Sequence, residues 1–73
     1  MRMNSEIRKK YYNICYKQKL NGLFNNESRE EQFYAQRRLI ESMFPKNEDE
    51  LASIRKKARE KAESDFNFFT TLS

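Results

Sequence analysis

The chain has 73 residues, of which 36% are charged, and it carries a formal net charge of +4 with no histidine. A chain this short forms one domain and buries only about 60% of its unfolded surface, so we expect a small core. Its single cysteine excludes an intramolecular disulfide, and the lack of histidine excludes an ordinary zinc site.

Glycine and proline each occur once, which favours helices because β-folds need many turn residues. The mean hydropathy of −1.10 leaves disorder as an alternative, but six Phe and four Tyr supply more core than disordered chains carry. We predict an all-α fold: a small three-helix bundle with helices at about 5–20, 28–44 and 47–66. A second copy of the chain could complete this bundle as a homodimer.

The first predicted helix, residues 5–20, holds most of the basic character of the chain. Residues 1–22 contain six basic side chains against one acidic side chain, whereas residues 46–73 are neutral. Ser5 is the predicted N-cap, and Gly22 is predicted to end the helix in a left-handed conformation. One helical stripe is predicted to face the core: Met3, Ile7, Tyr11, Ile14, Cys15 and Gln18.

The second predicted helix, residues 28–44, carries the widest apolar arc. Ser28 and Glu31 have the spacing of a capping box, and Pro45 is predicted to stop the helix at Phe44. The arc covers about half of the helix, and its members are Phe33, Ala35, Leu39, Ile40, Met43 and Phe44. This width predicts a central helix, packed on two sides by the other two.

The third predicted helix, residues 47–66, begins in an acidic cluster with Asn47 as its predicted N-cap. Its apolar stripe is narrow and consists of Leu51, Ile54, Ala58 and Ala62. The two alanines are small and let another helix approach closely. Residues 66–73 form an aromatic tail that we expect to pack on the core of this chain or on a partner.

Catalysis is poorly supported by this sequence, so we expect no enzyme activity, cofactor or small-molecule substrate. No histidine is present as a base poised near neutral pH, and phosphate-binding loops need more than one glycine. Cys15 lies on the apolar stripe with no histidine to activate it, which favours a buried structural thiol.

Two function classes remain. The first is a DNA- or RNA-binding helical regulator that uses the basic N-terminal helix, because basic side chains there alternate with aromatic rings. Its candidate contact residues are Arg8, Lys9, Lys19, Arg55, Lys56 and Arg59. No recognisable helix-turn-helix spacing links two of the predicted helices, which disfavours this class.

The second class, which we favour, is a small non-enzymatic module that binds and modulates a larger protein, with inhibition as the expected effect. Phage-type regulators of host replication or transcription enzymes are examples of this class. Aromatic and arginine side chains anchor such interfaces, and the candidates here are Arg8, Tyr12, Tyr16, Arg37, Arg38 and Phe68. A lone thiol and the lack of a long apolar run predict a cytoplasmic protein without membrane contact.

Overall fold

The computed structural model describes residues 3–72, which form three α-helices and no strand. The helices are α1 (Ser5–Leu23), α2 (Glu30–Met43) and α3 (Glu48–Leu72), and short 3-10 turns at Glu27–Arg29 and Pro45–Asn47 precede α2 and α3. The predicted all-α three-helix bundle is therefore confirmed. Residues 1–2 of the chain and residue 73 of the predicted tail lie outside the described part.

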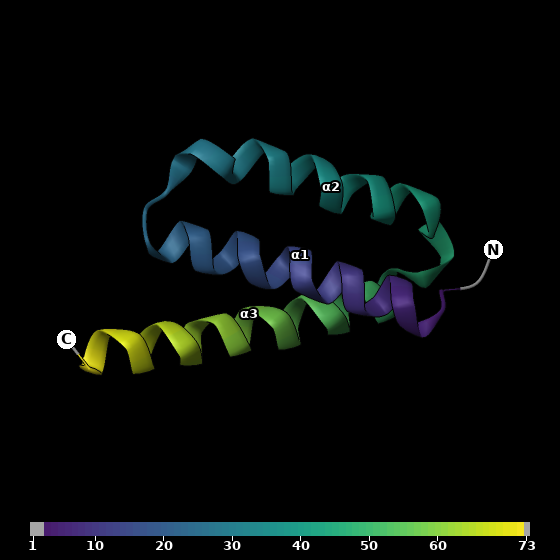
Figure 1. The fold of residues 1–73 in the computed structure, drawn as a ribbon. Helices are drawn as coiled ribbons and strands as arrows, with labels where there is room; N and C mark the ends of the chain where they lie inside the picture. Colours follow the sequence, from purple (N-terminus) through teal and green to yellow (C-terminus); the bar gives the residue numbers. More distant parts are fainter. Residues whose placement is uncertain (1–2, 73) are drawn as a thin grey trace.

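Helix α1 is the central helix of the bundle, with α2 on one flank and α3 on the other (Figure 1). It packs most extensively on α3 and less on α2, while α2 and α3 contact each other little. Helices α1 and α3 run in the same direction. Helix α2, which lies between them in the sequence, runs in the opposite direction. The prediction that the helix at 28–44 would be packed on two sides is wrong, because within residues 3–72 only α1 packs extensively against it.

The core follows from this arrangement. Its largest fully buried side chains are Tyr11 of α1, Phe44 and Leu51, so each segment of the bundle contributes one large group. Ala58 and Ala62 of α3 are also fully buried. These methyl groups let the backbones of α1 and α3 approach closely, as the small-residue stripe predicted.

The apolar arc of α2 is only half buried. Ile40 is buried as predicted, but Leu39 and Met43 are 64% and 47% exposed, and Ala35 is also exposed. The cause is geometric: α2 packs extensively on only one helix in the described part of the chain, and one helix covers a narrower sector than the apolar residues of α2 occupy. Two large apolar side chains therefore face solvent beside α1.

The ends of α1 differ from the prediction by one to three residues. Asn4 is the N-cap instead of Ser5, and its side-chain oxygen accepts from the backbone amide of Ile7 at 2.9 Å. Gly22 remains within the helix, and the left-handed residue is Asn25, with φ of 59°. Asparagine tolerates this conformation, so the turn did not require the glycine.

The start of α2 also differs from the prediction. The Ser28 hydroxyl bonds to Oδ1 of Asn26 at 2.7 Å, so no capping box with Glu31 forms, and α2 begins two residues later. Arg29 occupies the N-cap position without a side-chain bond. The predicted end is confirmed, because α2 stops at Met43 and Pro45 opens the next turn.

Helix α3 is longer than predicted at its C-terminal end. Asn47 lies in the preceding 3-10 turn, and its side-chain amide donates to Glu50 at 3.2 Å instead of capping a backbone amide. No glycine or proline follows Pro45, so the helix continues through the predicted tail to Leu72. Phe66 packs edge-on against Phe24 beyond the end of α1, with ring centroids 5.0 Å apart.

Candidate functional site

The first hollow on the surface is an apolar groove between α1 and α2, of about 400 Å³. We call it the α1–α2 groove, and its lining is Ile7, Lys10, Ile14, Gln36, Leu39, Ile40, Met43 and Phe44. Ile14, Ile40 and Phe44 are core residues that form its floor. Leu39 and Met43 stand on its α2 rim, where the single-sided packing of α2 leaves them exposed.

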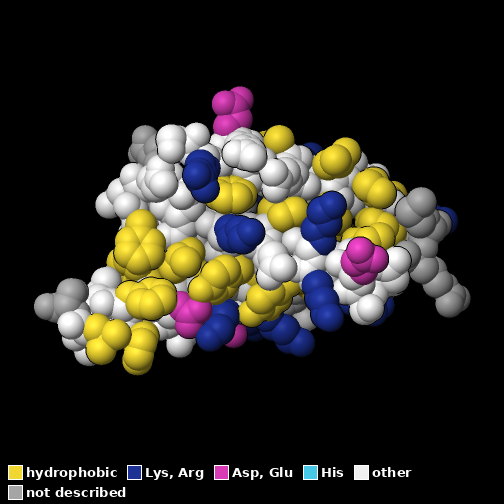
Figure 2. All heavy atoms as spheres, in the orientation of Figure 1, with side chains coloured by type: hydrophobic (Ala, Val, Ile, Leu, Met, Phe, Trp, Pro, Cys, Tyr) yellow, Lys and Arg dark blue, Asp and Glu magenta, His cyan; other side chains and the backbone are white. Residues whose placement is uncertain are grey.

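The surroundings of this groove are basic. Lys10 and Gln36 are its only polar members within residues 3–72, so the lining contains no carboxylate. On the same side of α1 Lys17 is also exposed, whereas Lys9 lines the groove between α1 and α3. Figure 2 shows this face, where apolar side chains are intermixed with Lys and Arg side chains and few carboxylates appear. The groove therefore combines an apolar floor with a positively charged border.

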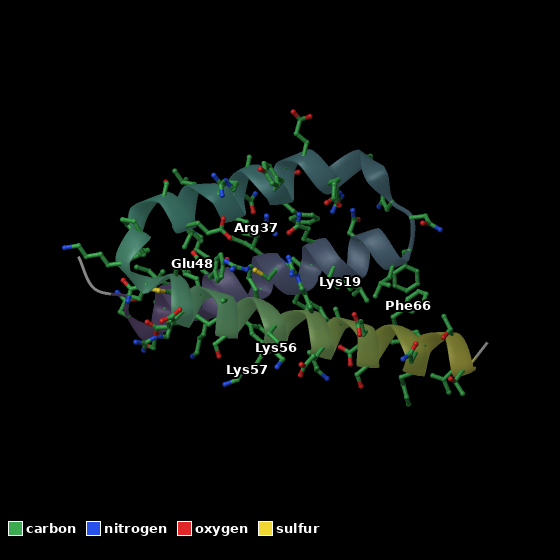
Figure 3. All side chains as sticks on the ribbon, turned by 180° about the vertical axis from the view of Figure 1, so that it is seen from behind. Lys19, Arg37, Glu48, Lys56, Lys57 and Phe66 are labelled. Carbon is green, nitrogen blue, oxygen red and sulfur yellow. The ribbon has the colours of Figure 1, made fainter. Side chains whose placement is uncertain are left out.

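The second hollow is polar and lies between α2 and α3, with a volume of about 370 Å³. We call it the arginine cleft, and its lining is Arg37, Arg38, Glu41, Ser42, Glu48, Arg55 and Arg59. Figure 3 shows Arg37 and Glu48 in the space between α2 and α3, whereas Lys56 and Lys57 lie on the side of α3 away from α2.

The Glu41 carboxylate is the centre of this cleft. Its Oε2 accepts a hydrogen bond from the Tyr11 hydroxyl at 2.5 Å and another from Arg55 Nη1 at 3.1 Å. Its Oε1 lies 3.4 Å from Arg38 Nη1, and Arg37 Nε lies 3.4 Å from Oε2. One carboxylate thus faces three guanidiniums and joins all three helices.

The same network sets the protonation of its members. Burial and the hydrogen bond to Glu41 raise the pKa of Tyr11, so its hydroxyl keeps its proton and remains a donor. The hydrogen bond to Glu48 raises the pKa of Arg55 further above its ordinary value. Arg37 Nε is buried without a hydrogen-bond partner among residues 3–72, although Oε2 of Glu41 lies 3.4 Å away.

Cys15 is a buried thiol, as the sequence predicted. It is buried and unpaired, and burial raises the pKa of its thiol above the ordinary value. A raised pKa keeps the sulfur protonated near neutral pH, and a protonated thiol is a poor nucleophile.

The predicted partner-binding residues do not form one surface. Arg8 and Tyr12 line a shallow groove between α1 and α3, and Arg8 is paired with Glu50. The Tyr16 hydroxyl donates to Asp65 of α3 at 2.5 Å, so this side chain ties two helices together. Arg37 and Arg38 line the arginine cleft. Phe68, 62% exposed, lies near the end of α3 against Phe69.

The predicted nucleic-acid residues are also divided. Arg8 and Lys9 line the shallow α1–α3 groove, whereas Arg55 and Arg59 line the arginine cleft between α2 and α3. Three of the six predicted residues are paired with carboxylates: Arg8 with Glu50, Lys19 with Glu63, and Arg55 with Glu41 and Glu48. This pairing reduces the charge that is free to neutralise phosphates.

Within residues 3–72, no group of three metal-ligating side chains converges, and none of the helices is long and apolar enough to cross a bilayer. Comparison of the chain with protein-family models, curated proteins and solved structures gave no match. The functional argument therefore depends on the two hollows described above.

Sequence reasoning did not find either hollow. It placed Leu39 and Met43 in the core, although the width of the apolar arc on α2 was already the signal that one neighbour could not cover it. The contact between Glu41 and Arg55 spans helices and follows no local spacing, so only the fold brings these residues together.

Proposed function

We propose that this protein is a small non-enzymatic module that binds a larger protein and modulates it, with inhibition by covering a site on the partner as the expected effect. The α1–α2 groove is its contact surface. The observation that carries the proposal is the exposure of Leu39 and Met43 on the rim of a groove with an apolar floor.

The energetics favour a contact at this groove. Fully burying one Leu or Met side chain contributes about 1.5–3 kcal/mol. The two rim residues therefore provide a compact source of binding free energy. Methionine is also unbranched and flexible, so Met43 can adapt to the shape of a partner. The floor residues are already ordered by the core, which lowers the entropic cost of binding.

The charge around the groove favours a partner with acidic side chains beside its apolar contact residues. Two copies of this chain joined groove to groove would bring Lys10 of one copy close to the basic border of the other, and such like-charge contacts are costly. A different protein is therefore the favoured occupant, and a homodimer is an outcome that the experiment can reveal.

Two further features support the proposal. Phe68, Phe69 and Leu72 are exposed at the C-terminal end of α3, beyond the end of α1 and away from the groove, where they form a separate apolar surface that a protein partner can contact. The buried free thiol of Cys15 supports a role in a reducing compartment such as the cytoplasm.

The test is capture of a protein by the immobilised chain from cell lysate treated with nuclease. We expect one stoichiometric protein, identified by mass spectrometry, whose affinity changes little with salt. Leu39→Lys should weaken its binding about 10- to 100-fold, which corresponds to the loss of one buried apolar side chain. Ala52→Lys is the matched control, because it adds the same charge at an exposed position of α3 outside the groove.

Three outcomes would contradict the proposal. One is capture of no protein. Another is equal binding by Leu39→Lys and Ala52→Lys with circular dichroism unchanged. The third is affinity for DNA or RNA that falls steeply between low and moderate salt and depends on Arg8 and Lys9. That result would identify the nucleic-acid regulator instead.

A further inference from the structure

The arginine cleft lies on a different face from the α1–α2 groove and carries an inference that does not depend on the proposed function. We propose that this cleft is a binding site for a dianionic phosphomonoester group.

The first argument is the charge of the cleft. Its lining contains four guanidiniums and two carboxylates, which leaves a net charge of +2. Glu41 is shared among Arg37, Arg38 and Arg55, and Glu48 pairs with Arg55. Arg59 makes no ion pair within the described part of the chain. A phosphomonoester near neutral pH carries almost two negative charges and would balance this excess.

The second argument is the unused donor capacity around the hollow. A guanidinium presents several N–H donors in a planar fork that matches phosphate oxygens. Arg38 is 63% exposed, and its 3.4 Å bond to Glu41 is long, so its fork is open to a ligand. Arg59 is exposed on the facing helix α3. These two arginines stand on opposite walls of a hollow of about 370 Å³.

The third argument is that the walls are held in place. Tyr11, Glu41 and Arg55 are joined by hydrogen bonds from three helices, so the inner part of the cleft is fixed before a ligand arrives. A fixed site loses less entropy on binding than a flexible one. Because Glu41 and Glu48 offset the inner Arg37 and Arg55, Arg38 and Arg59 supply both the excess positive charge and the direct contacts.

The experiment titrates methyl phosphate into the isotope-labelled chain and follows the arginine Nε–H signals by NMR at constant ionic strength. Dimethyl phosphate, a monoanion that resembles the nucleic-acid backbone, is the matched probe. We expect saturable shifts with methyl phosphate and about tenfold weaker binding of dimethyl phosphate. The affinity for methyl phosphate should also fall as the pH is lowered below about 6, where the dianion is protonated.

Arg59→Gln should weaken binding of methyl phosphate about tenfold. Lys57→Gln removes the same charge outside the cleft and should leave the affinity nearly unchanged. Because Arg59 is exposed and unpaired, its substitution should not disturb the fold, and circular dichroism checks this. Arg38→Gln is the second variant, and it tests the arginine on the opposite wall of the cleft in the same way.

Equal affinity for the two esters, no saturable shift at any pH, or equal weakening by Arg59→Gln and Lys57→Gln would each overturn the proposal. A dephosphorylated oligonucleotide that binds the cleft when methyl phosphate does not would also overturn it.

Discussion

The hydroxyl of Tyr11 provides the sharpest test of how the three helices are held together. Tyr11→Phe keeps the buried ring but removes one donor to Glu41 and one acceptor for Arg55, at 2.5 and 2.9 Å. Both partners are charged and largely shielded, with side chains 11% and 19% exposed. Hydrogen bonds to charged groups contribute about 1.5–3 kcal/mol. Since Glu41 and Arg55 keep their own ion pair, we expect a loss of about 1.5–2 kcal/mol.

The assay is urea unfolding followed by circular dichroism, with Tyr34→Phe as the matched control. Tyr34 is exposed, and its hydroxyl makes no hydrogen bond within residues 3–72. Its substitution should change the free energy of unfolding by no more than about 0.5 kcal/mol. A double-mutant cycle of Tyr11→Phe with Glu41→Gln should give a coupling of about 1 kcal/mol. If Tyr11→Phe costs no more than Tyr34→Phe, the network does not stabilise the fold as argued.

Three further predictions concern the contacts between α1 and α3 and the buried thiol. Ala58→Leu should lower the free energy of unfolding by about 1–3 kcal/mol in a urea titration, because Ala58 is fully buried and a larger side chain would force the packed helices apart; an unchanged midpoint would contradict this packing. Cys15 should react slowly with a thiol reagent in buffer and rapidly in urea, because burial restricts access and raises its pKa; equal rates would contradict its burial. Hydrogen bonds from Tyr16 and then Lys61 lower the pKa of Asp65, so its stabilising effect is present above its ordinary value of 3.8 and is lost as the pH falls through the lowered pKa. Asp65→Asn should therefore be less stable than the parent chain at neutral pH, and the difference in stability between the two should shrink only as the pH falls from 3.8 through the lowered pKa; a constant difference would contradict the assigned shift.

The helical class, the stripes of α1 and α3 and the stop at Pro45 could be predicted from the sequence, because each depends on local spacing or on proline chemistry. Ile14 and Leu51 are buried as their spacing indicated. The helix caps were harder to predict, because several polar residues within each turn can occupy the N-cap position. Asn4 and not Ser5 caps α1, and the Ser28 hydroxyl bonds to a loop side chain instead of a helix amide.

The arrangement of the helices could not be predicted from periodicity. A wide apolar arc indicated that α2 was central, but the arc records which residues are apolar and not how many neighbours cover them. The narrow alanine stripe of α3 allows the more extensive contact with α1. Because α1 also packs on α2, α1 and not α2 is the central helix. Both candidate sites arise from this difference: Leu39 and Met43 were left exposed, and arginines of α2 and α3 came to face each other across a cleft.

Oxidation of the methionines by dilute peroxide, followed by mass spectrometry, tests the role of the α1–α2 groove most directly. Met43 is 47% exposed and Met3 is 5% exposed, so Met3 is an internal control. We predict that Met43 is oxidised several times faster than Met3 in the free chain. Its rate should fall to that of Met3 once the captured partner is bound at saturation. A Met43 that is already protected in the dilute free chain, or that stays equally reactive in the complex, would contradict the assignment of this groove as the binding surface.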